Sequence, residues 1–195
     1  MSQHLCGLQG YDPGRGDKCP GCHGGKEFGA QQSLLGVAQR VRTTDDYYTP
    51  EWVFDGMGLE FDLDPASPPG GVDYIPVERF LTKADDGLHA EWEGRVWLNP
   101  PFSEVSPWAR KFIAHGNGVL LAPCSKAAWP SEVWNASRLV WLPRVSFKFG
   151  TPGQGRTDAG NQVPVSLFLA AMGDECAVAL RRLAGQYPGA LMRTA

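Results

Sequence analysis

The residues best suited to chemistry are Asn99, Pro100, Pro101 and Phe102, in the run RVWLNPPFSE at 95–104. They follow an apolar stretch typical of a strand, and neither proline has an N–H with which to continue a sheet ladder. The chain is therefore expected to leave the sheet at Asn99 in a stiff, extended conformation. That exit would hold the Asn99 and Pro100 carbonyls as hydrogen-bond acceptors close to an aromatic ring.

These groups suit an amino group carried by an aromatic ring. Two rigid acceptors can bind both hydrogens of an NH2 group, while Phe102 offers a flat apolar face for stacking. Holding both hydrogens out of the ring plane would localise the nitrogen lone pair. Attack on an activated methyl group would then depend on positioning more than on a strong base. The alternative is that the two prolines merely end a strand.

Strand-like and helix-like segments alternate at short intervals around this motif. Strands are predicted at 59–64, 95–98, 118–123, 138–149 and 163–172, and helices at 50–57, 106–116, 128–137 and 174–186. Such alternation without repeats favours an α/β fold with a doubly wound sheet. The last two strands are joined by a polar, glycine-rich loop instead of a helix, so we expect them to form an antiparallel pair.

Two of the predicted helices share a starting signature. Thr49 and Ser106 are expected to be N-caps, with Pro50 and Pro107 at the first helical positions. A hydroxyl before the first turn can accept a backbone N–H, and a proline at that position costs no hydrogen bond.

Polar residues follow several predicted strands, where ligands bind in open α/β sheets. Asp64 follows the first strand, Asp85 and Asp86 follow a short segment that begins at 77, and Asn99 follows the next strand. The glycine-rich loops that cradle phosphates, GxxxxGK[ST] and GxGxxG, do not occur in the sequence. An acidic edge suits a ligand with amino and hydroxyl groups and positive charge.

The ordered motifs resemble those of a known family. NPPF resembles the [DNS]PP[FYW] motif of amino-group methyltransferases that use S-adenosylmethionine. Further matches lie on both sides of it, at Thr49-Pro50-Glu51-Trp52, Leu63-Asp64-Pro65-Ala66-Ser67, Asp85-Asp86-Gly87-Leu88 and Pro107-Trp108. Over about residues 45–172 the chain is similar to the phage-type DNA N6-adenine methyltransferase family. The resemblance implies a Rossmann-like methyltransferase sheet, mostly parallel with an antiparallel C-terminal strand pair.

The resemblance also implies a set of cofactor contacts, made by Thr49, Pro50, Asp64, Ala66, Asp85 and Asp86. Thr49 and Pro50 would lie near the methionine end of S-adenosylmethionine. Asp64 would contact the cofactor, and either Asp85 or Asp86 would contact its adenosine part. Two simpler readings stay open, since Asp64 could be a helix N-cap and 85–87 is good turn chemistry without a ligand.

The same resemblance implies catalytic roles for the NPPF motif. Asn99 and the Pro100 carbonyl would hold the target amino group, Pro101 would stiffen the frame, and Phe102 would stack on the base. That base must leave the duplex, because its amino group is otherwise buried in base pairing. Phe102 in place of the commoner tyrosine keeps the stacking face. Cytosine N4 is the alternative target, since the same acceptors suit any exocyclic amine.

Double-stranded DNA is the expected partner, although the formal net charge is −3. Arg144, Lys148 and Arg156 flank or lie in the loop between the last two predicted strands. They are candidates for phosphate contact or base readout. The alternative is an ordinary hairpin tip without a role in binding.

Residues 1–42 are expected to form an appendage to a methyltransferase domain at 43–195. The appendage is rich in glycine and polar residues, and Cys19-Pro-Gly-Cys22 is a suitable turn for two thiolates on one metal. Cys6, Cys19, Cys22 and either His4 or His23 could therefore hold a structural zinc. A tail with free thiols is the alternative. If zinc is bound, a further possibility is a non-catalytic zinc-bearing DNA-binding module on a methyltransferase scaffold.

The composition sets the remaining expectations. The hydrophobic fraction is 43% and the charged fraction 20%, as in globular proteins. No apolar run approaches the length of a membrane span, and the N-terminus lacks the apolar core of a signal peptide. We therefore expect a cytoplasmic protein. The resemblance implies an enzyme of a phage-infected or prophage-bearing bacterial cell, which catalyses site-specific methyl transfer from S-adenosylmethionine to the N6 amino group of a flipped adenine.

Overall fold

The structure is a computed structural model, and it describes residues 48–149, 161–162 and 166–193. All of these residues belong to one compact unit, Val41–Ala195. Its elements are α1 (Glu51–Met57), β1 (Phe61–Asp64), β2 (Val77–Phe80), the 3-10 helix η2 (Lys83–Asp85), β3 (Val96–Leu98), α2 (Val105–His115), β4 (Gly118–Pro123), α3 (Trp129–Ala136), β5 (Leu139–Pro143), β6 (Lys148–Phe149), β7 (Asn161–Gln162), β8 (Leu167–Met172), α4 (Asp174–Ala184) and β9 (Gly189–Arg193).

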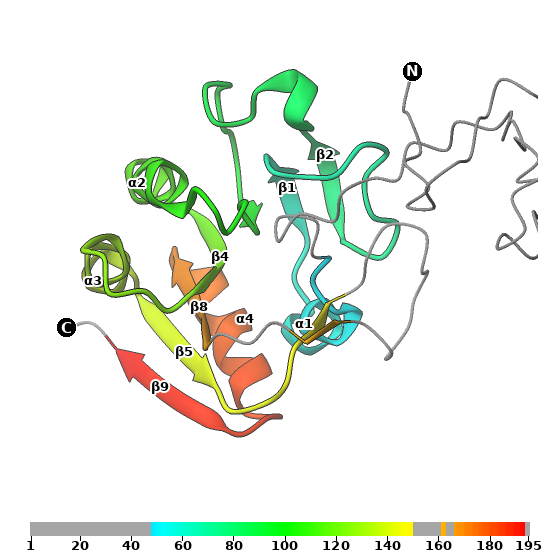
Figure 1. Cartoon of the computed structure of the whole chain (residues 1–195). Coiled ribbons are helices and arrows are strands. Elements are labelled where there is room, and N and C mark those ends of the chain that lie inside the picture. Colours follow the sequence, from blue (N-terminus) through cyan, green and yellow to red (C-terminus); the bar gives the residue numbers. More distant parts are fainter. Residues whose placement is uncertain (1–47, 150–160, 163–165, 194–195) are drawn as a thin grey trace, which may run out of the picture. The chain divides into compact units, whose positions relative to one another are not determined.

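Seven of the strands form one mixed sheet in the order β2-β1-β3-β4-β8-β5-β9 (Figure 1). The first four are parallel to their neighbours, whereas β8 runs antiparallel between β4 and β5, and β9 is antiparallel to β5. The prediction of an antiparallel pair near the C-terminus is thus confirmed by β5 and β8. The fold is mixed α/β, mostly parallel over its first half and antiparallel over its second.

The predicted strand at 138–149 is wrong in its length. The sheet strand β5 ends at Pro143, and the residues 148–149 of β6 pair with β7 in a separate two-stranded sheet. Pro143 has no N–H for a ladder, which favours an end to pairing there. Strand β9 was not predicted, because GALMR has neither a long apolar run nor a strict alternation.

Alternate residues of the central strands pack on opposite faces of the sheet. In β4, Val119 and Leu121 join a cluster with α1 and α4, while Leu120 and Ala122 join a cluster with α2 and α3. The fully apolar run of β4 is therefore explained by burial on both faces. In β1, Phe61 and Leu63 are both buried.

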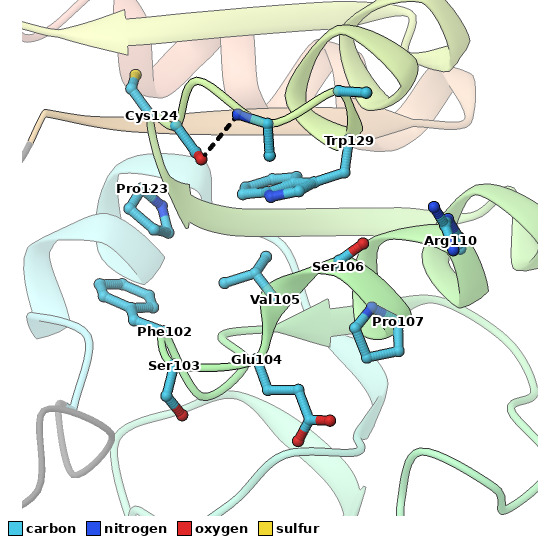
Figure 2. Close-up of a pocket in the computed structure, with 13 residues that line it drawn as sticks. Phe102, Ser103, Glu104, Val105, Ser106, Pro107, Arg110, Pro123, Cys124 and Trp129 are labelled. Carbon is cyan, nitrogen blue, oxygen red and sulfur yellow. Dashed lines mark hydrogen bonds between the residues drawn. The ribbon is translucent and has the colours of Figure 1, made fainter.

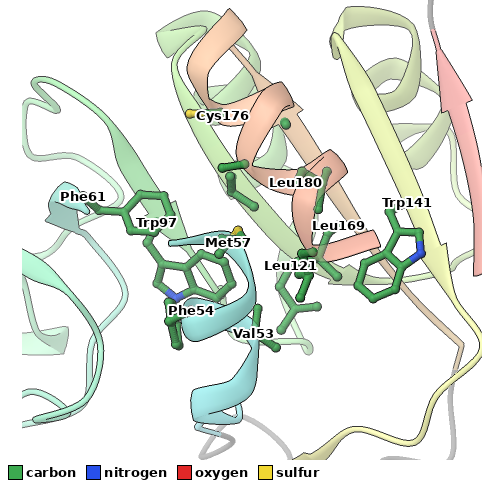
Figure 3. Close-up of a cluster of buried hydrophobic side chains, with 14 of the residues drawn as sticks. Val53, Phe54, Met57, Phe61, Trp97, Leu121, Trp141, Leu169, Cys176 and Leu180 are labelled. Carbon is green, nitrogen blue, oxygen red and sulfur yellow. The ribbon is translucent and has the colours of Figure 1, made fainter. Parts of the chain in front are cut away.

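Strand β3 is anchored by Trp97, which lies inside the first of these clusters (Figure 3). Its ring meets Phe54 of α1 edge-on at 4.7 Å and lies 5.7 Å from Phe61 of β1. Burial of a side chain this large contributes about 3 kcal/mol. Because Trp97 lies two residues before Asn99, this packing fixes the point where the chain leaves the sheet.

Both predicted N-caps are wrong. Helix α1 begins at Glu51 with Pro50 as its capping residue, and α2 begins at Val105 with Glu104 in that position. Neither helix has a side-chain hydrogen bond at its cap. Pro107 still lies in the first turn, where its missing N–H costs nothing. Thr49 is turned into the protein, so its hydroxyl is available for another role.

Within the described residues, none of the helices is both long and apolar enough to cross a membrane.

Candidate functional site

The carboxyl ends of four parallel strands lie next to one another at one edge of the sheet. Asp64 at the end of β1 pairs with Phe80 at the end of β2, and Leu98 at the end of β3 pairs with Leu120 of β4. Asp64 and Asn99 therefore leave the sheet from neighbouring strands. The structure brings these two predicted site residues to the same edge, as the sequence indicated.

Asp64 is a buried carboxylate, with 4% of the residue exposed. Its Oδ1 accepts a hydrogen bond from the Ala66 N–H at 3.0 Å. Burial raises the pKa of Asp64 from its usual 3.8 to about 7, although hydrogen bonds from Ala66 and Ser67 oppose that rise. A turn rather than a helix follows at 65–66, so the N-cap reading is wrong. A desolvated carboxylate at this edge can bind a ligand that donates hydrogen bonds or carries positive charge.

The turn after β2 uses its polar groups internally. Asp85 accepts hydrogen bonds from the N–H and the hydroxyl of Thr82, at 2.8 and 2.7 Å, and forms a capping box with it. These bonds lower the pKa of Asp85. Asp86 lies in the left-handed region, with φ at 50°, and contacts His89 at 2.9 Å. Both acids are exposed. The geometry supports the view that 85–87 is a turn in its own right.

Gly87 brings this turn against the segment after β1. A Cβ atom at Gly87 would lie 1.9 Å from the Pro65 carbonyl oxygen. Only glycine fits so close to that backbone, and its contact joins the two candidate cofactor segments directly. Apart from the glycine after two acids, no sequence pattern indicates this contact.

The NPPF segment leaves β3 as a compact turn. Asn99 is half-buried with its Oδ1 inside the protein, Pro100 is buried, and the Glu104 N–H donates to the Pro101 carbonyl at 3.1 Å. The ring of Phe102 meets the ring of Phe149 edge-on at 6.3 Å. This contact links the motif to β6 at the base of the small two-stranded sheet. Strand β3 thus ends at Leu98, directly before the motif, as the two prolines indicated.

A pocket of about 660 Å³ lies between the loop after β3 and the loop after β4 (Figure 2). Phe102 and Val105 approach it from one side, and Pro123 and Trp129 approach it from the other. Arg110, Glu104 and several serines give the rest of the lining a polar and charged character. The flat apolar faces of Phe102 and Trp129 suit a planar organic ring, and the polar groups suit its hydrogen-bonding atoms. Trp129 belongs to none of the motifs recognised in the sequence.

Thr49 is nearly fully buried, with 1% of the residue exposed. Its carbonyl accepts a hydrogen bond from the Tyr74 hydroxyl at 2.8 Å. Its own Oγ1 finds no hydrogen-bond partner among the described residues. Burying such a hydroxyl without a partner costs free energy, which a ligand could recover. Like the buried carboxylate of Asp64, this hydroxyl is suited to a ligand with hydroxyl or amino groups.

The predicted DNA contacts are only partly covered by the structure. Arg144 is exposed between β5 and β6 and Lys148 is exposed on β6, whereas Arg156 lies outside the described residues. The structure therefore allows both cations to reach a polyanion without assigning them that role.

The proposed zinc ligands Cys6, Cys19, Cys22, His4 and His23 also lie outside the described residues. Across 48–149, 161–162 and 166–193, no three His, Cys, Asp or Glu side chains gather into a group that could hold a metal ion. Zinc in the N-terminal segment therefore remains a prediction.

Comparison with known proteins gives one result. The model of the family described as DNA N-6-adenine-methyltransferase (Dam) matches residues 37–180. No curated protein matches the chain. The matched range includes every element from α1 to β8, and with them the sheet edge and the NPPF turn.

Proposed function

The chain belongs to the DNA N-6-adenine-methyltransferase (Dam) family, a family of enzymes, and on that premise we propose that it uses S-adenosylmethionine to methylate a flipped-out adenine in DNA. The observation that carries this proposal is the shared sheet edge. A rigid NPPF turn and a buried carboxylate leave neighbouring strands there, so that two substrates can meet. The sheet is consistent with a Rossmann-like methyltransferase layout.

Two buried polar groups fit the cofactor. The buried Asp64 carboxylate would accept hydrogen bonds from its hydroxyl or amino groups, and the Thr49 hydroxyl would gain a partner. Pro50 and Ala66 would line the same site, and the exposed turn at 85–86 would lie beside it. S-adenosylmethionine, when bound, supplies a methyl group on a positively charged sulfur. That charge is one reason for an acidic rather than a phosphate-binding edge.

The NPPF turn would hold the adenine. Asn99 and the Pro100 carbonyl would accept the two hydrogens of the N6 amino group, and Pro101 would keep the frame stiff. Phe102 would stack on the base, with its ring already oriented by Phe149. The pocket beyond Phe102 provides apolar walls for a base that has left the duplex.

The phosphate backbone of DNA would be bound by exposed cations outside this pocket. Arg144 precedes the small two-stranded sheet and Lys148 lies in its strand β6, and both side chains are exposed. We propose that they contact phosphates together with Arg156. Such contacts position the duplex and make binding dependent on salt.

The direct test is transfer of a labelled methyl group from S-adenosylmethionine to genomic DNA. We expect incorporation by the unmodified protein and a loss of at least about 100-fold in kcat for Asn99→Ala, since the acceptor acts at the reacting nitrogen. Isothermal titration should show that Asn99→Ala binds the cofactor with an affinity within about threefold of that of the unmodified protein. Asn135→Ala, an exposed asparagine on α3, is the matched control and should keep full activity.

The outcomes separate the possible functions. Full activity of Asn99→Ala would show that the site is misassigned. Nucleoside analysis of the product should give N6-methyladenine, and N4-methylcytosine would instead identify the alternative target. Cofactor binding without transfer to any DNA would contradict the proposed reaction.

A further inference from the structure

Lys111 on α2 extends its ammonium group into the loop that follows η2. Nζ donates to the carbonyls of Leu88, at 2.7 Å, and Ala90, and lies 3.5 Å from the carbonyl of Gly87. It also lies 4.8 Å from the centre of the Trp92 ring. Three carbonyl oxygens and an aromatic face thus surround one ammonium group. These interactions match its three donors and its positive charge.

The same loop is fixed to α2 and to itself by aromatic contacts. The Trp92 ring packs against Trp108 of α2, with centres 6.2 Å apart and planes at 25°. The Trp92 Nε1–H donates to the Gly87 carbonyl at 2.8 Å. Gly87 is therefore held from the α2 side by Lys111 and Trp92. On its other side it touches the Pro65 carbonyl, at a distance that a Cβ atom could not tolerate.

These contacts form a continuous path between the two halves of the proposed site. One end is α2, whose first turn continues from the NPPF segment. The other end is the turn at 65–66, which directly follows Asp64 at the end of β1. Between them lie Lys111 and Gly87. Neither α2 nor this turn is a strand of the sheet, so sheet pairing does not hold them together. The contacts of Lys111 and Gly87 therefore determine where Gly87 lies relative to both.

We infer that Lys111 is a positioning residue for the cofactor: by holding the loop at 87–92 it keeps Gly87 against Pro65 and so shapes the site around Asp64. This inference rests on the proposed function, because it concerns the same site. Lys111 acts through the loop backbone and touches neither substrate. Its effect is therefore expected on cofactor affinity and not on DNA affinity.

The test compares Lys111→Met with Lys83→Met, a lysine that is exposed on η2 in the same loop region. Methionine keeps most of the stem and removes the three donors. We expect Lys111→Met to raise the Kd for S-adenosylmethionine about tenfold in titration calorimetry, with the KM for DNA within about twofold. Lys83→Met should change neither value. A merely destabilising change would not separate the two substrates in this way.

A second variant reaches the same contact from the other side. Gly87→Ala would place a Cβ against the Pro65 carbonyl and displace the turn. It should raise the Kd for the cofactor as Lys111→Met does, and the double variant should be little worse than either, because both break one path. If Lys111→Met does not fold, as judged by thermal unfolding, Gly87→Ala alone decides the inference.

The failures of the two proposals can be told apart. If the unmodified protein binds no S-adenosylmethionine, the proposed function is wrong. If it binds the cofactor and a folded Lys111→Met variant binds it equally well, the proposed function stands and the role of Lys111 is overturned. Equal losses of cofactor and DNA affinity would also overturn it.

Discussion

Thr82 and Asp85 use their polar groups in the opposite way from Thr49 and Asp64. In the turn after β2, the Thr82 hydroxyl donates to Asp85, and both residues are fully used in a capping box near solvent. Thr49 and Asp64 are both buried instead. The Thr49 hydroxyl has no partner among the described residues, and burial raises the pKa of Asp64 to about 7.

The difference separates a scaffold from a binding surface. A polar group that is satisfied within its own turn stabilises the turn and gains little from a ligand. A buried polar group with unmet hydrogen-bonding capacity costs stability, and such groups are concentrated at functional sites. Of the acids at this edge, Asp64 is thus the stronger candidate for contact with the cofactor, and Asp85 serves the backbone.

The sharpest way to break this comparison is to neutralise each acid in turn. We expect Asp64→Asn to raise the Kd for S-adenosylmethionine roughly 10- to 100-fold, because it removes a charge-assisted hydrogen bond. Asp85→Asn should change that Kd by about twofold at most and lower the Tm slightly, because its amide is a weaker cap. Titration calorimetry on both folded variants measures the contrast. A larger loss of affinity in Asp85→Asn would reverse the assignment.

The second expected effect is on pH dependence. If the ionised Asp64 binds the cofactor, affinity should rise about tenfold per pH unit below 7 and level off above it. Stability should show the opposite trend. Because the folded pKa of Asp64 lies above its usual 3.8, this group lowers the free energy of unfolding as pH rises from about 4 to about 7.

Urea unfolding and cofactor titration between pH 5 and pH 8 measure both trends. The Asp64→Asn variant is the reference, since its side chain does not titrate. The pH dependence that we attribute to Asp64 should be present in the unmodified protein and absent from Asp64→Asn. If the two proteins differ by the same amount at every pH between 5 and 8, Asp64 does not titrate in this range.

The smallest expected effect separates the two threonines. Thr49→Val keeps the shape and removes the buried hydroxyl, so we expect the protein without ligand to become about 1 kcal/mol more stable. Its Kd for the cofactor should rise about fivefold. Thr82→Val should instead lose about 1 kcal/mol of stability through its missing cap, with the Kd unchanged. Thermal unfolding with and without cofactor gives all four values, and a destabilised Thr49→Val variant would contradict the comparison.

Much of the fold followed from local patterns in the sequence. The double-sided burial of β4 was readable from GVLLAP, and the end of β3 was readable from its two prolines. The position of β8 was not, because its insertion between β4 and β5 depends on long-range pairing that no local period encodes. The helix starts were misplaced for a related reason, since a buried Thr49 reflects tertiary packing rather than capping preference.

The candidate site was predictable at its strand ends and less so elsewhere. Asp64 and Asn99 follow strands directly, so their meeting at one edge could be inferred. The hydrogen bonds of Asp85 to its own turn and the contacts of Lys111 could not be inferred from the sequence, because each depends on the direction of a side chain. Trp129 and Phe102 line the same pocket although they lie in separate segments of the chain, so no local motif indicated a role for Trp129.

The place of β8 also bears on how the chain is made. On a ribosome, β4 and β5 emerge well before 167–172, yet neither can pair with the other, because β8 takes the space between them. Both strands are apolar on each face, so their open edges invite pairing with other chains while synthesis continues. The sheet can be completed only after residues 167–172 have left the ribosome. A stop codon shortly before β8 would therefore leave a product with two unpaired, apolar strand edges instead of a smaller folded domain.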